Sequence, residues 1–163
     1  MLVGLGYDVH RFKKGIPLVL GGVRIAHPRG LDGHSDADVI VHAVMDALLG
    51  AAGLSDIGTY FPNTDPRFRN ISSMILLKEV MKLLKKERKA VVNVDVTVLA
   101  EEPILKPHVL QMKKNFSEAL AILPARVGIK ATTNEHMGFI GRGEGIAALA
   151  VCLLAPQKKK PSR

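Results

Sequence analysis

The feature that most restricts the fold is a run of nine apolar residues near the C-terminus, from Ile146 to Leu154. The run is far shorter than the roughly 18 apolar residues that a membrane-spanning helix needs. We interpret it as a strand that is buried on both faces. Helices of the same chain can cover one of these faces. We expect the other face to pack on other subunits, because a bare apolar sheet face is unstable in water.

Periodicity predicts the remaining elements. Valines alternate with polar residues at 92–98, which is typical of a strand, and apolar residues recur at helical spacing after Ser35 and after Ser73. The predicted strands are 3–11, 18–25, 92–98, 127–133 and 146–154, and the predicted helices are 35–53, 73–89 and 107–123. The order ββααβαββ predicts one α+β domain over residues 1–156, with a mixed four-stranded-type sheet covered by helices on one face. Residues 157–163 are expected to form a basic disordered tail.

Local signals refine these boundaries. Ser35 and Asp38 have the spacing of a capping box and predict that the first helix begins at Ser35. Glycines 21 and 22 interrupt the second strand, and residues 27–33 read as a loop. Ile75 is expected on the buried face of the second helix, together with Leu76, Val80, Leu83 and Leu84. Residues 54–70 lack periodicity, and loops of that length are often functional.

The composition indicates a single globular domain. The chain has 163 residues, of which 47% are hydrophobic, and its one cysteine, Cys152, leaves no partner for an internal disulfide. We find no signal or transit peptide and expect a cytoplasmic enzyme that does not bind membranes. The net charge of +8 makes nucleic-acid binding an alternative. We expect no nucleic-acid binding, because Trp is absent and aromatic residues, on which bases stack, are only 4% of the chain.

Asp8, His10 and His42 have the residue types and spacing of a metal site. Asp8 and His10 are two residues apart on a strand, so their side chains share one face. His42 lies on an apolar helix, where a hydrogen-bonded core histidine is the plainer interpretation. Asp38 and Asp46 lie four residues to either side, and either could hold the second ring nitrogen of a metal-bound His42. Two imidazoles and one carboxylate leave a tetrahedral position open, as in catalytic zinc sites.

Three further segments suggest phosphate binding. Gly33, His34 and Ser35 precede the predicted helix start, where free backbone N–H groups attract anions. The segment Thr132, Thr133, Asn134 and Glu135 follows a strand and suits phosphate oxygens and a hard cation. The glycine-rich segment 141–145 matches no nucleotide-binding fingerprint, and close packing between subunits explains it equally well.

Together these segments resemble the 2-C-methyl-D-erythritol 2,4-cyclodiphosphate synthase family of the non-mevalonate isoprenoid pathway. The shared motifs are GYDVH at 6–10, GHSDAD at 33–38, HAVMDALLGA at 42–51, DIG at 56–58, FPNTD at 61–65, NVDVT at 93–97, KATTNE at 130–135 and GFIGRGEG at 138–145. They cover nearly the whole chain apart from the basic end. The chain starts at the first strand, as in the stand-alone enzymes rather than those fused to a cytidylyltransferase.

The resemblance implies a phosphorus–oxygen lyase that closes a ring. In 4-diphosphocytidyl-2-C-methyl-D-erythritol 2-phosphate, the 2-phosphate attacks the β-phosphate, CMP leaves, and a cyclic diphosphate remains. The resemblance further implies one Zn²⁺ per subunit on Asp8, His10 and His42, and Mg²⁺ or Mn²⁺ on Glu135. His34 and Thr133 would be catalytic and stabilise the transition state.

The resemblance also implies the substrate contacts and the assembly. The contact residues would be Asp8, Val9, His10, His34, Ser35, Asp56, Ile57, Gly58, Phe61, Pro62, Asn63, Thr64, Asp65, Ala100, Glu101, Glu102, Pro103, Ile104, Leu105, Lys106, Ala131, Thr132, Thr133, Asn134, Glu135, Phe139 and Arg142. Those from 100 to 106 would form the cytidine pocket. The family is a homotrimer with active sites between subunits, and Phe139 and Arg142 would lie near the threefold axis, where an isoprenoid diphosphate can bind.

Three residues depart from the family pattern. Asn63 replaces a usual Asp, Ile104 replaces a common Lys, and Tyr7 replaces a frequent Phe. Two other functions stay open from the residues alone. In a metal-dependent phosphohydrolase, water would occupy the open metal position. In a metal-stabilised binding module there would be no turnover.

Overall fold

The structure is a computed structural model, which describes residues 1–157. Its main element is a five-stranded mixed sheet in the order β4-β1-β7-β5-β6. The strands are β1 (Leu2–Lys14), β4 (Arg29–Leu31), β5 (Lys89–Leu99), β6 (Val127–Thr132) and β7 (Gly145–Pro156). The pair β5 and β6 is parallel, and the other pairs are antiparallel. This confirms the single α+β domain with a mixed sheet. The sheet has five strands and not the four expected, because β4 pairs with the end of β1. Most of the predicted tail, residues 158–163, lies outside the described part of the chain.

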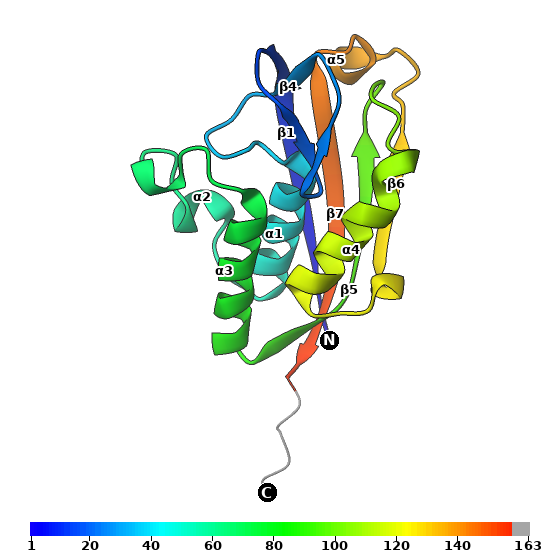
Figure 1. Ribbon diagram of the computed structural model, residues 1–163. Coiled ribbons are helices and arrows are strands. Elements are labelled where there is room, and N and C mark those ends of the chain that lie inside the picture. The colour runs from blue at the N-terminus through cyan, green and yellow to red at the C-terminus, as the bar shows by residue number, and fades with distance from the viewer. Residues whose placement is uncertain (158–163) are drawn as a thin grey trace, which may run out of the picture.

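Three helices cover one face of the sheet (Figure 1). These are α1 (Val39–Ala51), α3 (Ser73–Lys86) and α4 (Val109–Leu120). Shorter helical turns lie in the connections: α2 (Ile57–Tyr60), η1 (Pro66–Phe68), η2 (Lys106–His108), η3 (Pro124–Arg126) and α5 (Gly138–Gly141). Among residues 1–157, the structure contains no helix with the length and apolar character needed to span a bilayer.

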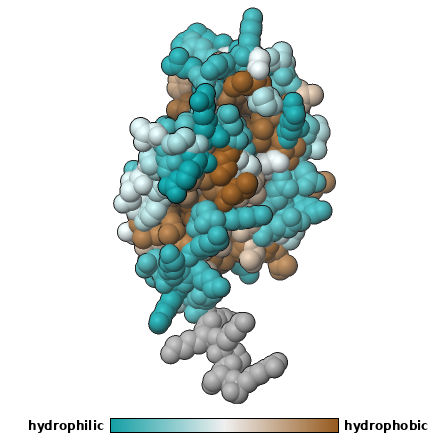
Figure 2. Space-filling model, turned by 60° about the vertical axis from the view of Figure 1, so that its left-hand side comes forward, coloured by the Kyte–Doolittle hydropathy of each residue, from teal (hydrophilic) through white to brown (hydrophobic). Residues whose placement is uncertain are grey.

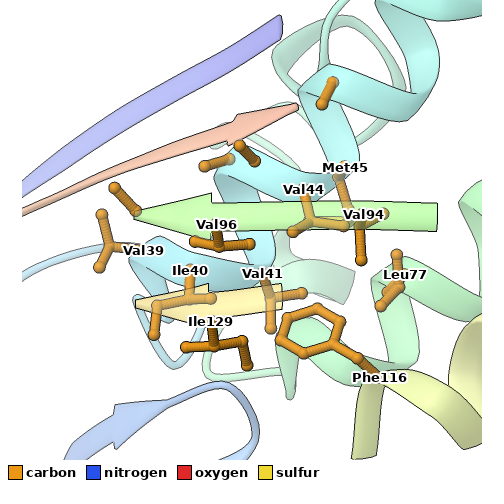
Figure 3. Close-up of a cluster of buried hydrophobic side chains, with 14 of the residues drawn as sticks. Val39, Ile40, Val41, Val44, Met45, Leu77, Val94, Val96, Phe116 and Ile129 are labelled. Carbon is orange, nitrogen blue, oxygen red and sulfur yellow. The ribbon is translucent and has the colours of Figure 1, made fainter. Parts of the chain in front are cut away.

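Helix α1 is the centre of the core. All but two of its residues are buried, and its side chains interleave with those of β5, β6, α3 and α4, as Figure 3 shows for Val41, Val96, Ile129 and Phe116. The helix approaches β1 closely because β1 carries glycines there. A Cβ on Gly4 would lie 2.0 Å from the Ala47 carbonyl oxygen, and a Cβ on Gly6 would lie 2.0 Å from that of Ala43. These glycines bring His42 against β1.

The opposite face of the sheet stays uncovered within the chain. Alternate residues of β1 point outward, and Leu5 is 67% exposed. The face of the last strand that was expected to pack on other subunits carries Leu149 and Val151 of β7, which are exposed at 37% and 43% in the single chain. The outer face consists of Val3, Leu5, Tyr7, Val9, Leu149 and Val151. On the α2 and α3 side of the molecule, hydrophobic residues also surface in the middle of a mainly hydrophilic face (Figure 2).

Several predicted boundaries were wrong. The strand expected at 18–25 is a hairpin of β2 (Leu18–Leu20) and β3 (Val23–Ile25), because Gly21 and Gly22 take positive φ angles and form a turn. Part of the expected loop 27–33 is β4, which pairs with the end of β1. Ile75 is 49% exposed, and Leu77 takes the buried position on α3 instead.

The first helix begins later than its capping-box pattern suggests. Asp38, and not Ser35, is the N-cap of α1, and its carboxylate accepts from the backbone N–H of Val41. The same carboxylate accepts from the N–H groups of Gly21 and Gly22. Burial raises the pKa of Asp38 to about 6. Asp38 therefore ties the β2–β3 turn to the helix that carries His42.

Candidate metal centre and substrate pocket

Asp8, His10 and His42 meet at the contact between β1 and α1. The Asp8 Oδ2 atom lies 2.9 Å from His10 Nε2 and 3.0 Å from His42 Nδ1, and the two nitrogens are 3.1 Å apart. Within residues 1–157, this is the group of His, Cys, Asp and Glu side chains placed to hold a metal ion. The predicted triad is thus brought together by the fold.

Hydrogen bonds on the outer side of each ring orient the two histidines. His10 Nδ1 donates to the backbone oxygen of Asp32 over 2.7 Å. His42 Nε2 lies 2.9 Å from Ser73 Oγ and 3.1 Å from Ser35 Oγ. The expectation that Asp38 or Asp46 would hold this nitrogen was wrong. Asp38 caps α1, and Asp46 accepts from the Ile57 N–H, which locks α2 against α1.

The donor set fits a divalent cation. A neutral His10 that donates through Nδ1 has a lone pair on Nε2. This lone pair points toward the Asp8 carboxylate and the Nδ1 atom of His42. Three electron-rich atoms about 3 Å apart repel one another unless a proton or metal lies between them. Around zinc, with bonds of about 2.0–2.1 Å, tetrahedral ligand atoms lie about 3.4 Å apart. A relaxation of a few tenths of an ångström would therefore admit the ion.

The pKa values of the cluster reflect attraction between the Asp8 carboxylate and the two histidines when the histidines carry protons. Burial acts to raise the pKa of Asp8, but hydrogen bonds from His10 and His42 outweigh it and hold that pKa well below its usual range. Burial acts to lower the pKa of His10, and the hydrogen bond to Asp8 outweighs it and raises that pKa. Asp8 is therefore ionised at neutral pH, which a metal ligand requires.

The triad lies in a pocket of about 230 Å³. The pocket is lined by Asp8, His10, Gly33, His34, Ser35, His42, Met45, Ile57, Gly58, Phe61, Asn63, Phe68 and Leu76. His34 belongs to this lining, and its Nε2 atom lies 3.2 Å from the Asp65 backbone oxygen. Met45, Phe68 and Leu76 were missed from the sequence, because their apolar side chains have no pattern that separates a pocket wall from the core.

The predicted anion site at Gly33, His34 and Ser35 is not at a helix N-terminus. Helix α1 begins at Val39, so these residues belong to an irregular segment before it. The Ser35 hydroxyl oxygen accepts from the Ala37 N–H and faces the outer nitrogen of His42. His34 and Ser35 still line the pocket, but without the field of helix-end N–H groups.

Part of the 56–65 segment lines the pocket, and part supports it. Ile57, Gly58, Phe61 and Asn63 belong to the lining. Asp56 caps α2 through the Thr59 N–H, and Asp65 caps η1 and pairs with Arg67. Pro62 and Thr64 lie between these residues in the sequence. Within the described chain, the pocket lining does not include Asp56, Pro62, Thr64 or Asp65.

The other predicted contacts gather elsewhere. The segment 100–106 follows the end of β5, and the segment 131–135 includes the adjacent end of β6. Glu101 Oε1 joins the two segments by accepting from the Asn134 and His136 N–H groups. Glu135 accepts from the Thr133 hydroxyl over 3.0 Å. None of the residues 100–106 or 131–135 lines the triad pocket of the described chain. At about 4.8 Å per strand, β5 and β6 lie about 10 and 14 Å from β1.

Another cavity lies on the outer side of the sheet. It has a volume of about 760 Å³ and is lined by residues that include Val9, Phe139 and Arg142. Val9 points away from the triad, because successive residues of a strand face opposite sides. The cavity wall also contains Arg29, which pairs with Glu102 and donates to the Gly143 backbone oxygen. Val9, Phe139 and Arg142 are thus together, but apart from the triad pocket.

Comparison with known proteins was made for the sequence and for the fold. The YgbB family model matches residues 1–155. A curated 2-C-methyl-D-erythritol 2,4-cyclodiphosphate synthase of Symbiobacterium thermophilum is 59% identical over 95% of this chain and 99% of its own length. The enzyme of that name from Chlorobium phaeovibrioides is 57% identical over 94% of this chain and 98% of its own length.

Solved structures agree with the sequence comparison. The bifunctional IspDF protein of Campylobacter jejuni superposes with a TM-score of 0.91 and 43% identity over 95% of this chain, which spans 42% of that longer protein. A Plasmodium falciparum IspF solved as a CDP complex has a TM-score of 0.84 and 35% identity, and covers 96% of this chain and 97% of its own. The chain therefore belongs to the YgbB family, together with the curated 2-C-methyl-D-erythritol 2,4-cyclodiphosphate synthases that it matches over nearly their full length.

Proposed function

We propose that the protein is a 2-C-methyl-D-erythritol 2,4-cyclodiphosphate synthase, a phosphorus–oxygen lyase. An oxygen of the substrate's 2-phosphate attacks the β-phosphorus, the bond from that phosphorus to the α-phosphate oxygen breaks, and CMP leaves. The observation that carries the proposal is the triangle of donor atoms on Asp8, His10 and His42 in a pocket, in a chain 59% identical to a curated synthase. No side-chain nucleophile is needed, since the attacking and leaving groups belong to one substrate.

The chain's residues supply position and charge. Asp8, His10 and His42 would hold Zn²⁺, which supplies Lewis acidity toward a β-phosphate oxygen when bound. His34 lines the pocket, where a ring N–H could donate to a phosphate oxygen, and Ser35 lines the pocket as well. Ile57, Gly58, Phe61 and Asn63 would enclose the erythritol phosphate, supported by Asp56, Pro62, Thr64 and Asp65. The amide of Asn63 replaces a family carboxylate and would contact the substrate without a charge.

The segments beyond β5 and β6 form the second half of the proposed site. Ala100, Glu101, Glu102, Pro103, Ile104, Leu105 and Lys106 would form the cytidine pocket, with Ala131, Thr132 and Asn134 beside them. Thr133 would stabilise the transition state, and Glu135 would hold Mg²⁺ or Mn²⁺. The relative solved as a CDP complex supports a cytidyl substrate. The side chain of Ile104 is apolar and has no donor for phosphate, so Lys106 is the one cationic residue of the segment 100–106.

A homotrimer would unite the two halves. In one chain the second half lies about 10 to 14 Å from the triad strand, so a neighbouring subunit is the source that can complete the pocket. The outer face of β1 and β7 offers an apolar surface for this contact. Val9, Phe139 and Arg142 would then surround the threefold axis, where the guanidinium of Arg142 could hold an isoprenoid diphosphate.

One assay separates the proposed reaction from its alternative. Purified protein is incubated with the cytidyl substrate, Zn²⁺ and Mg²⁺, and the products are identified by phosphorus NMR. We expect CMP and the cyclic diphosphate in equal amounts. Inorganic phosphate without cyclisation would instead favour a phosphohydrolase that uses the same triad, and the absence of any product would leave a binding module.

Subunit mixing tests the shared site. The variants His42→Ala and Glu135→Ala should each be inactive. In a trimer that mixes them, one site per trimer combines a native triad with a native Glu135. Random mixing in equal amounts should therefore restore about a quarter of wild-type activity. If the site lay within one chain, mixing would restore none.

A further inference from the structure

A buried hydrogen-bonded chain lies behind the metal triad. Ser73, the first residue of α3, is fully buried, and its Oγ lies 2.9 Å from His42 Nε2. On its other side, the same hydroxyl donates to Asp36 Oδ1 over 2.5 Å. We propose that Asp36 and Ser73 are positioning residues that fix the ring tautomer of His42, so that its Nδ1 lone pair points at the metal.

The proton count determines the direction of this chain. The Ser73 hydroxyl has one proton, and the Asp36 carboxylate can only accept. That proton therefore belongs to the Ser73–Asp36 hydrogen bond, and Ser73 Oγ faces His42 Nε2 as an acceptor. The Ser35 hydroxyl is a second, more distant partner, 3.1 Å from the same nitrogen. A histidine with its proton on Nε2 carries its lone pair on Nδ1, the atom that faces Asp8 and His10.

The geometry of Asp36 is held by further contacts. Its carboxylate also accepts from the Ser73 backbone N–H, at 3.1 Å to each oxygen. Its own backbone N–H donates to the Ile71 oxygen. Asp36 thus sits across the start of α3 and cannot turn away from Ser73. The Ser73 side chain is buried and cannot contact the substrate, so its hydroxyl can act only through His42.

Loss of either residue should release the His42 ring. In Ser73→Ala, Nε2 loses its main acceptor. In Asp36→Asn, the amide can donate to Ser73 Oγ, which frees the hydroxyl to donate to His42 Nε2. The ring then carries its proton on Nδ1, where it excludes the metal. Comparable changes behind metal-bound histidines weaken metal binding by about 10- to 100-fold.

In the competing explanation, Asp36 and Ser73 only stabilise the fold, because Asp36 also accepts from a backbone N–H at the start of α3. A double-mutant cycle on zinc affinity, measured by competition with a chelator, separates the two. We expect Ser73→Ala and Asp36→Asn each to bind zinc about 10- to 100-fold more weakly, and the double variant to be no weaker than the worse single variant. Losses that multiply would overturn the proposal. Ser72→Ala is the matched control, because the Ser72 side chain makes no capping hydrogen bond at the same helix start.

A spectroscopic measurement reads the tautomer directly. In zinc-loaded protein with ¹⁵N-labelled histidine, we expect a slowly exchanging proton on His42 Nε2 in the wild type and in Ser72→Ala. Its signal should be lost in Ser73→Ala. A signal unchanged in Ser73→Ala would overturn the inference. The inference rests on the proposed metal site: wild type that binds no zinc would refute both, whereas normal zinc binding by all variants would refute only the positioning role.

Discussion

Replacing Gly6 by alanine should force α1 away from β1 and open the metal triad. The added Cβ would lie 2.0 Å from the Ala43 carbonyl oxygen and 2.7 Å from the Ala47 nitrogen, both on the backbone of α1. Backbone atoms cannot swing aside as a flexible side chain can. Real Cβ atoms keep 3.0 Å or more from such atoms, so the helix must retreat by about 1 Å.

A displacement of that size has two consequences. Overpacking of this kind destabilises a protein by about 1–3 kcal/mol. The His42 ring moves with α1, while Asp8 and His10 stay on β1, so the distances of 3.0 and 3.1 Å from His42 Nδ1 lengthen. Metal–ligand bonds tolerate deviations of only about 0.2 Å. We therefore expect zinc affinity to fall at least about tenfold and turnover on the order of 100-fold.

The assay combines urea unfolding with zinc competition on the same samples. Gly50→Ala is the matched control, since Gly50 lies on the exposed side of the same helix with no atom within 4 Å of an added Cβ. That variant should bind zinc normally and gain about 0.5–1 kcal/mol, because alanine favours a helix. The reasoning is refuted if Gly6→Ala unfolds within about 0.5 kcal/mol of the wild type and keeps its zinc affinity.

Three further outcomes are expected. His42→Ala should lose both stoichiometric zinc and turnover, and retention of zinc, measured by atomic absorption, would show that the ligand assignment is wrong. Because Asp8 raises the pKa of His10, protons should compete with zinc for His10 already above pH 6.5. Zinc affinity, measured by chelator competition, should therefore fall as the pH is lowered through 7 toward 6. A flat profile in that range would contradict the proposed ligands. Leu5→Lys should convert the proposed trimer to monomers in size-exclusion chromatography with light scattering, whereas Ile75→Lys on the outer side of α3 should not.

Much of the fold can be predicted from the sequence, because the apolar residues of its helices and strands recur with clear periodicity. The alternating valines of β5 and the helical spacing in α1 and α3 predict element types correctly, since those patterns arise from burial of one face. Boundaries that depend on side-chain hydrogen bonds were less well predicted. Ser35 has the spacing of a helix cap, yet Asp38 takes that role because its carboxylate also binds the β2–β3 turn. That contact joins residues distant in the sequence, so no local pattern reveals it.

The sequence by itself determined the candidate metal ligands, because Asp8 and His10 share a strand face and His42 belongs to the same set of family motifs. Only the tertiary structure decided what holds them. The outer nitrogen of His42 meets Ser73, 31 residues away, and not the neighbouring carboxylates that helical spacing suggested. It also decided that Glu135 and Thr133 lie apart from the triad in one chain, because β7 and β5 separate β1 from β6. Sheet order is a property of the folded chain, and it separates the predicted site residues of one chain into two groups.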